Sequence, residues 1–198
     1  MKIMRKVVRV IYEPTKIKVL SDPVRREILR ELRSEPQTQT QLAGKLMLAK
    51  PSIRHHLQKL LKARLINITR TQVGSHGILQ KYYEPTANLF IVDFEKTPPE
   101  LQKYFLQSHI ERIRGMLSVF QLFGKTKKQI IQITSSKLKA LAEEVARHMS
   151  SIGKKYEKKG ATMNRETLLI TIYSEALEEI ITGDEWKDFF ANISSIPA

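Results

Sequence analysis

The sequence predicts a mainly α-helical protein with a small antiparallel β-sheet in its first half and a helical region in its second half. Three observations lead to this fold class. Apolar residues recur three and four positions apart through much of the chain, as they do on one face of a helix. Short stretches with period two, rich in β-branched side chains, are found within residues 1–90. The 198 residues, of which 41% are hydrophobic, allow two small domains, which we expect at residues 1–90 and 91–198.

The net charge of +14 is distributed unevenly between these two parts. Residues 1–90 carry 18 Lys or Arg against 6 Asp or Glu, whereas residues 91–198 carry 16 against 14. A strongly basic domain suits a polyanionic partner such as DNA. The absence of cysteine excludes disulfides and thiolate metal sites. No apolar run approaches the roughly 20 residues that span a membrane, so we expect a soluble, cytoplasmic protein with no membrane partner.

A short strand and a helical segment open the chain. Lys6–Tyr12 is rich in β-branched residues and predicts a strand at the edge of a small sheet. Thr15–Glu35 predicts helix, within which Asp22 has the place of an N-cap and Pro23 that of a first helical residue. This segment would be the scaffold on which the following residues pack.

Two short helices follow, and the second has one apolar and one polar face. Thr40–Leu46 predicts the first helix, and residues 51–63, which begin with a proline, predict the second. The residues expected to face the core are Ile53, Leu57 and Leu60 or Leu61. The opposite face carries hydrogen-bond donors and no acid: Ser52, Arg54, His55, Gln58 and Lys59. Such a pair of helices is a helix-turn-helix, whose second helix enters the major groove of DNA.

The same two helices belong to a long stretch without acidic residues. No Asp or Glu occurs between Glu35 and Glu84, whereas eight Lys or Arg do. A solvated helical surface usually mixes both signs of charge, and a carboxylate held against phosphate would oppose binding. The stretch therefore favours contact with DNA, the alternative being a surface that is merely basic.

A β-hairpin follows the second helix. From Ile66 the pattern changes to period two, residues 74–77 form a turn cluster, and a second strand returns to Tyr83. A hairpin directly after a recognition helix, here residues 66–83, is a wing. Four of its polar residues are expected to reach phosphate or the minor groove: Arg70, Gln72, His76 and Lys81. The alternative is a plain surface hairpin, which its position and lack of acids make less favourable.

Three motifs within residues 15–86 carry a family resemblance. They are Leu20-Ser-Asp-Pro-Val-Arg-Arg-Glu-Ile-Leu, Gln41-Leu-Ala, and the segment Pro51–Ile66 with its His-His-Leu. Together they resemble the ArsR-like (arsenic-repressor-type) winged helix-turn-helix transcription regulators. The resemblance implies a recognition helix that reads the major groove, in a dimer bound to a two-fold operator. It implies reading roles for Lys50, Ser52, Arg54, His55 and Gln58.

Two residues depart from the pattern of that family, which usually caps the recognition helix with Ser or Thr and closes it with Gly. Ala49 stands at the cap, so the cap must come from Ser52, a phosphate or water. Arg64 stands at the glycine, where a left-handed arginine costs roughly 1 kcal/mol, so we expect a different helix end. The metal-sensing members use Cys and His clusters. Here His55 and His56 point about 100° apart on a helix, and we expect neither a metal nor a cofactor.

The second half is expected to contain an irregular connector, residues 88–94, then three long helices and a final short one. Thr97–Glu100 has the sequence of a capping box for the first helix, and Asn164 that of a cap for the third. The second long helix, residues 135–159, has coiled-coil-like spacing. Its stripe is the expected homodimer interface: Leu138, Leu141, Val145, Ile152 and Tyr156. The alternative is an intramolecular bundle.

An effector pocket could form between these helices. Its aromatic candidates are Tyr104, Phe105, Trp186 and Phe189. At helical spacing such residues are more often core, so no small-molecule effector is assigned. No glycine-rich phosphate loop, His-Glu-x-x-His or recognisable nucleophile setting occurs in the sequence, so we do not expect an enzyme.

The sequence therefore predicts a sequence-specific transcription regulator, more specifically a repressor, that binds double-stranded DNA as a homodimer. Arg54 and Gln58 would hydrogen-bond base edges. The residues expected to contact phosphates are Lys50, Ser52, Lys59 and Arg70. Two alternatives stay open, a sequence-tolerant protein that coats DNA or chromatin and a winged helix used as a protein-interaction module.

Overall fold

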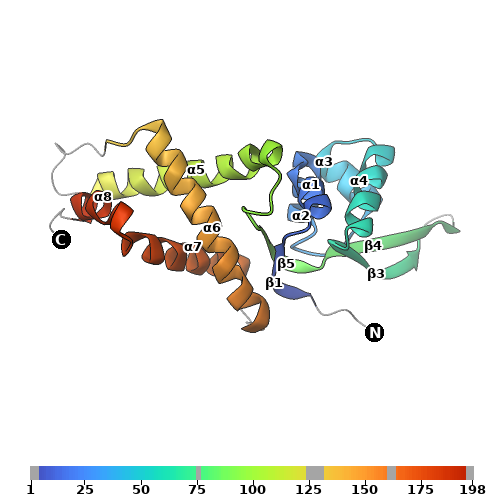
Figure 1. The fold of residues 1–198 in the computed structure, drawn as a ribbon. Coiled ribbons are helices and arrows are strands. Elements are labelled where there is room, and N and C mark those ends of the chain that lie inside the picture. The colour runs from blue at the N-terminus through green and yellow to red at the C-terminus, as the bar shows by residue number, and fades with distance from the viewer. Residues whose placement is uncertain (1–4, 75–76, 124–131, 160–163, 195–198) are drawn as a thin grey trace.

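The chain folds into two lobes joined by a small sheet (Figure 1). The computed structural model describes residues 5–74, 77–123, 132–159 and 164–194. The helices are α1 (Pro14–Ser21), α2 (Pro23–Glu31), α3 (Gln39–Leu46), α4 (Lys50–Lys62), α5 (Pro99–Phe123), α6 (Ser135–Lys159), α7 (Arg165–Ile181) and α8 (Asp184–Ser194). The strands are β1 (Lys6–Ile11), β2 (Gln37–Thr38), β3 (Ile66–Val73), β4 (Leu79–Pro85) and β5 (Ala87–Val92). The predicted fold class, mainly helical with a small antiparallel sheet, is confirmed.

Helices α1 to α4 pack around the core of the first lobe. Its buried side chains come from all four helices: Ile17, Ile28, Leu42, Ile53, Leu57 and Leu60. The three from α4 are four and three positions apart, so the apolar spacing of the sequence identified the buried face of that helix.

Side-chain caps fix where two of these helices begin. The carboxylate of Asp22 accepts a hydrogen bond from the amide of Arg25 at 3.0 Å, as expected for the N-cap of α2. At the start of α3, the hydroxyl of Thr38 accepts from the amide of Gln41, whose side chain accepts from the amide of Thr38. This capping box was not predicted, although its Thr-x-x-Gln spacing was readable in the sequence.

Helices α3 and α4 both end on a left-handed residue that is not glycine. Met47 has φ 52° and Arg64 has φ 55°. After α4 the amide of Leu65 bonds to the carbonyl of Leu60 at 3.0 Å, and the amide of Arg64 to that of Leu61 at 2.9 Å. These are the two bonds of a Schellman motif. The expectation that α4 would end differently is wrong, because Arg64 takes the backbone conformation of a glycine.

The wing belongs to a three-stranded antiparallel sheet with the strand order β2-β4-β3. Strands β3 and β4 are the predicted hairpin, with an irregularity between Ile68 and Arg70. The two residues of β2 pair with Tyr83 and Tyr82. A strand of two residues is too short to show a period, and this is why it was not predicted.

Residues 88–94, predicted as an irregular connector, instead contain strand β5. It pairs in parallel with β1, with Val8 opposite Leu89 and Val10 opposite Ile91. A short apolar run is compatible with several structures. The partner strand, which lies far away in the sequence, is what decides between them.

The two faces of the β1–β5 sheet belong to different cores. Val8, Val10, Leu89 and Ile91 pack with the helices of the second lobe, whereas Ile11 packs with those of the first. This division follows from the alternation of side chains along a strand. The expected domain boundary between residues 90 and 91 falls within β5, so a shared sheet joins the lobes.

Helix α6 lies directly against this sheet at Gly153. A Cβ atom at this position would meet Cδ1 of Ile91 at 2.8 Å and Cγ2 of Val10 at 3.1 Å. The glycine therefore permits a close approach between helix and sheet that a larger residue would prevent.

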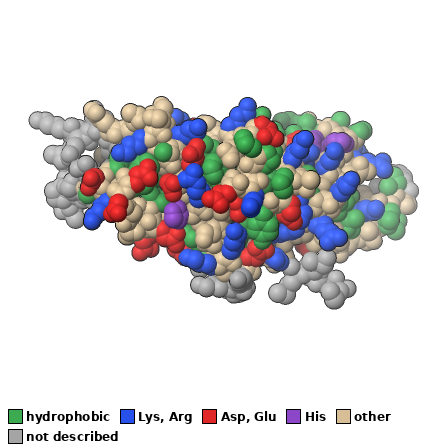
Figure 2. Space-filling model, viewed as in Figure 1, with side chains coloured by type: hydrophobic (Ala, Val, Ile, Leu, Met, Phe, Trp, Pro, Cys, Tyr) green, Lys and Arg blue, Asp and Glu red, His purple; other side chains and the backbone are tan. Residues whose placement is uncertain are grey.

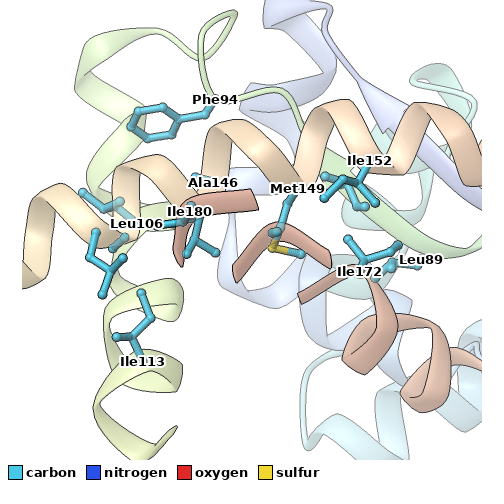
Figure 3. Close-up of a cluster of buried hydrophobic side chains, with 14 of the residues drawn as sticks. Leu89, Phe94, Leu106, Ile113, Ala146, Met149, Ile152, Ile172 and Ile180 are labelled. Atoms are coloured by element: carbon cyan, nitrogen blue, oxygen red, sulfur yellow. The ribbon is translucent and has the colours of Figure 1, made fainter. Parts of the chain in front are cut away.

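The second lobe is an intramolecular helical bundle. Ala146, Met149 and Ile152 of α6 lie beside Ile172 and Ile180 of α7 in its core (Figure 3). The stripe expected at a homodimer interface is buried in this core, with exposures of 5% for Leu138, 0% for Leu141, Val145 and Ile152, and 8% for Tyr156. These side chains are covered by β1, α5 and α7 of the same chain, so they do not lie on a surface that a second copy could reach.

The predicted caps of the second lobe have different outcomes. The hydroxyl of Thr97 does not form the predicted capping box but donates to the carbonyl of Asp93 at 2.7 Å. Asn164 caps α7 as predicted, because its side chain accepts from the amide of Thr167 at 2.9 Å. Within the described ranges, no helix has both the length and the apolar character needed to cross a membrane.

Candidate nucleic-acid interface

One face of α4 is open to solvent along the whole helix. Ile53, Leu57 and Leu60 hold the other face in the core with at most 2% exposure. Because a helix turns about 100° per residue, the remaining positions fall on the outer side. The six predicted contacts are all accessible there, with Lys50, Arg54, His55, Gln58 and Lys59 exposed and Ser52 half-buried.

Lys62 extends this outer face and was missing from the predicted contacts. It is exposed and follows Gln58 by four residues and His55 by seven, so the three side chains lie on one side of the helix. The same spacing was visible in the sequence and could have identified it.

The cations of α4 have no carboxylate partners among the residues that the structure describes. The helix itself contains no acid, and the nearby Glu31 and Glu35 lie 3.9 Å and 3.8 Å from Lys45 on α3. Within the described part of the chain, no side chain pairs with Lys50, Arg54, Lys59 or Lys62. A row of unpaired cations is the arrangement that a phosphate backbone neutralises, with release of its counterions.

The N-terminus of α4 is also open to an anion. Ala49 provides no side-chain cap, and the described contacts give Ser52 no capping hydrogen bond. The side-chain amide of Gln39 donates to the carbonyl of Lys50 at 2.8 Å and so ties α3 to the first turn of α4. The free amides of that turn are suited to a phosphate oxygen.

His55 and His56 have different environments. His55 is exposed. His56 is half-buried, with Nδ1 3.9 Å from the carboxylate of Asp22 at the start of α2. Burial lowers the pKa of His56, and the nearby Asp22 offsets part of this effect. The ring of His56 therefore packs α4 against the cap of α2.

The wing divides its predicted contacts between two faces. The guanidinium of Arg70 lies 4.0 Å from the ring centroid of Tyr82, its partner in the hairpin. Side chains alternate between the two faces along a strand, so Gln72 lies on the same face as Arg70. Lys81 pairs with Thr71 and therefore lies on the opposite face. Arg70 and Lys81 therefore point in opposite directions, so they cannot both contact the same segment of the DNA backbone. His76 lies outside the described residues.

The acidic side chains are unevenly distributed over the surface. Lys and Arg are visible over both lobes, whereas Asp and Glu gather over the helical lobe and the middle of the molecule (Figure 2). Residues 36–83 contain no acid, so α4 and the hairpin as far as Tyr83 together form an acid-free surface; Glu84 lies at the base of the hairpin, opposite Asn67.

Comparison with known families identifies the elements that build this surface. Residues 22–67 match the family described as bacterial regulatory protein, arsR family. The first lobe carries an ArsR-type helix-turn-helix domain. The matched residues of the ArsR-type domain run from the cap of α2 through α3 and α4 into β3, which supports a DNA-binding transcription regulator. No curated protein matches the chain.

The ArsR-type domain offers no recognisable metal site. Among the residues that the structure describes, no three His, Asp or Glu side chains come together in a group that could hold a metal ion. Its polar surface is instead a set of hydrogen-bond donors, which suits phosphates and the acceptor atoms of bases.

Proposed function

We propose that the protein is a sequence-specific transcription repressor that binds a two-fold operator as a homodimer. The observation that carries this proposal is the row of unpaired cations on the exposed face of α4, within an ArsR-type domain. Repression would follow where the operator overlaps a promoter.

The outer face of α4 suggests how DNA is read. Arg54 and Gln58 lie one turn apart, and their side chains match guanine and adenine in the major groove. Lys59 and Lys62 lie beside them and would contact phosphates. Arg70 would make a further contact from the wing, where the ring of Tyr82 orients its guanidinium.

The dimer needs a surface other than the buried stripe of α6. Helix α5 offers one, because Tyr104, Val119 and Leu122 have exposures of 49%, 51% and 78%. Their spacing puts them on one side of the helix. Gly115 lies between them, and a Cβ there would meet nothing within 4 Å, so a partner helix can approach closely. We assign the dimer interface to this face.

Two other functions would use the same basic surface. A protein that coats DNA would bind with steep salt dependence but little preference for sequence. A winged helix that binds another protein would need an acidic partner to match the acid-free surface. The hydrogen-bond donors of Arg54 and Gln58 favour the reading of DNA bases over both of these alternative functions.

The test is selection of bound sequences from a pool of random duplexes, followed by salt titration of the best site. We expect a two-fold symmetric site with half-sites about 34–36 Å apart, bound roughly 10³-fold or more over random DNA. Retention of DNA without a common motif would favour the coating protein, and no retention would favour the protein-interaction module.

The dimer is tested separately by sedimentation. Leu122→Glu should convert the dimer to a monomer, because it places a charge in an apolar contact. Ile170→Glu is the matched control, since Ile170 is 67% exposed on α7 and lies outside the assigned face. A Leu122→Glu protein that stays dimeric would remove α5 from the interface.

A further inference from the structure

A cavity of about 230 Å³ lies where the two lobes meet, and DNA reading does not use it. Its walls come from α2 of the ArsR-type domain, from β5, and from α5, α6 and α7 of the helical lobe. Figure 1 shows these elements meeting in the middle of the molecule. A cavity of roughly 150 Å³ can bind benzene, so this one has room for a somewhat larger molecule.

The wall combines apolar side chains with one kind of charge. Leu29, Phe90, Phe105, Met149 and Leu169 give it apolar surface. The charged residues that line it are Arg26, Arg33, Arg112 and Arg165, and no Asp or Glu is among the lining residues. Of the four aromatic residues that the sequence offered for a pocket, Phe105 lines this cavity.

Arg33 has no carboxylate partner among the described residues, and Arg165 has Glu166 on one of its nitrogens only. Burial lowers the pKa of Arg33 to about 10; the nearby charge of Arg165 adds to this effect, and that of Glu166 offsets part of it. The Nε of Arg33 donates to the carbonyl of Leu29 at 3.3 Å. Glu166 pairs with Nη1 of Arg165, but its own side chain is 74% exposed. The Nε of Arg165 is buried and has no hydrogen-bond partner in the described structure.

Two guanidinium groups held close together in a partly buried site repel each other. The repulsion disappears when an anion accepts hydrogen bonds from both, and arginine forms such bonds with a carboxylate in a two-pronged geometry. Arg33 and Arg165 also line a second, neighbouring cavity, which holds two further arginines, Arg5 and Arg30, and one acid, Glu166. Its charged lining is therefore mostly basic, so the anion could enter from solvent on that side.

His109 adds a donor to the wall. Arg112 donates to the hydroxyl of Tyr173 at 3.2 Å, so that hydroxyl is free to donate to Nδ1 of His109, which leaves the ring proton on Nε2. Burial lowers the pKa of His109 to about 4, and the ring is uncharged at neutral pH. The arginines and this histidine are hydrogen-bond donors, so the site calls for a ligand that accepts.

We propose that this cavity binds a small organic monocarboxylate, with its carboxylate between Arg33 and Arg165 and its apolar body against Phe90 and Phe105. Arg33 follows α2, which packs on the helix-turn-helix, whereas Arg165 begins α7 of the other lobe. A bound carboxylate therefore ties the lobes together and changes the affinity for DNA by linkage. This regulatory consequence rests on the proposed function, whereas the binding site does not.

The site is tested by calorimetric titration of the full chain without DNA. The probes are 3-phenylpropionate and octanoate, compared with 3-phenylpropan-1-ol, which lacks the charge, and acetate, which lacks the apolar body. We expect both amphipathic carboxylates to bind. The alcohol and acetate should bind with an affinity lower by about tenfold or more, because each lacks one half of the interaction. Equal affinity for the alcohol, or no heat with either carboxylate at millimolar concentration, would overturn the proposal.

Substitutions test the assigned residues. Arg33→Gln and Arg165→Gln should each weaken binding of 3-phenylpropionate about tenfold or more, without lowering the thermal midpoint, because each removes a repulsion. Arg114→Gln is the control, since Arg114 lies on α5 and pairs at the surface with Glu111 at 2.8 Å. Leu169→Trp, which fills the cavity, should abolish binding. Unchanged binding in both arginine variants would contradict the assignment.

The regulatory consequence is read from the affinity for the selected operator with and without saturating 3-phenylpropionate. A shift that is lost in Arg165→Gln supports the coupling. A carboxylate that binds but leaves the affinity for DNA unchanged overturns the coupling and keeps the site. Binding of the carboxylate by a protein that selects no DNA sequence would refute the proposed function and leave the site intact.

Discussion

Helices α4 and α6 are both amphipathic, and each buries one face in the core of its own lobe. Their polar faces differ. On α6 several cations have carboxylates within reach: Lys139 with Glu143 at 3.7 Å, Arg147 with Glu144 at 2.5 Å, and Lys155 with Glu179 at 3.4 Å. On α4 the described structure gives the cations no such partner.

The difference teaches how to read an amphipathic helix. The apolar spacing reveals that one face is buried, but the same spacing results from a core within the chain and from a partner chain. The balance of charge on the polar face carries the information about partners. Exposed ion pairs such as those of α6 satisfy their own charges, whereas the unpaired cations of α4 remain available to an external anion.

The largest effect should come from the buried face of α6. Leu141 is fully buried in the helical lobe, so Leu141→Ala should lower the free energy of unfolding by about 2–5 kcal/mol, measured with denaturant. Ile170→Ala on the exposed side of α7, outside the assigned dimer face, should change it by no more than about 0.5 kcal/mol. A Leu141→Ala protein that keeps its stability but no longer dimerises would contradict this account and would indicate that the stripe of α6 is a dimer interface after all.

The contact between α6 and the shared sheet should be the next most sensitive. Gly153→Ala adds a methyl 2.8 Å from Ile91 Cδ1, and such overpacking costs about 1–3 kcal/mol, more than the helix gains from alanine. The control is Gly44→Ala in α3, where the new methyl would meet nothing within 4 Å and should stabilise by about 0.5–1 kcal/mol. Equal thermal shifts for the two variants would contradict the close contact.

A smaller effect is expected at the end of α4. Arg64→Gly relieves a left-handed arginine and should raise the free energy of unfolding by up to about 1 kcal/mol. Arg64→Ala removes the same side chain but keeps the Cβ, so it should give no stabilisation. If both variants were equally stable in thermal unfolding, the left-handed backbone of Arg64 would not be the cause of the change in stability.

The smallest effect is expected at Lys62. Lys62→Gln should weaken binding to operator and random DNA by the same few-fold factor, because a phosphate contact does not depend on sequence. The slope of log affinity against log salt concentration should fall by about 1. Lys139→Gln on α6 should leave this slope unchanged, and a variant of Lys62 with an altered sequence preference would point to a base contact instead.

Local signals in the sequence identified the elements that depend on local chemistry. Asp22 and Asn164 were recognisable as caps, and the spacing of Ile53, Leu57 and Leu60 defined the outer face of α4. What the sequence did not reveal depends on distant residues. Strand β5 is a strand because β1 lies beside it, and Arg64 is left-handed because the turn into β3 requires it.

The same limit applies to the candidate sites. The face of α4 lies on one continuous segment, so its members could be found by counting along the helix. The arginine-lined cavity draws Arg33, Arg112 and Arg165 from three separate segments, and no spacing connects them. The stripe of α6 was recognised as a buried face, but what buries it could be seen only when α5, α7 and β1 were placed around it.

The most direct test of the central claim, that the unpaired face of α4 reads DNA, compares one arginine from each helix. The affinities of Arg54→Ala and Arg147→Ala are measured on the selected operator and on random DNA at one salt concentration. We expect Arg54→Ala to lose about 1–3 kcal/mol on the operator, with a smaller loss on random DNA and an unchanged thermal midpoint, and Arg147→Ala to bind like the unsubstituted protein. An Arg54→Ala protein that binds its operator with full affinity would contradict the account.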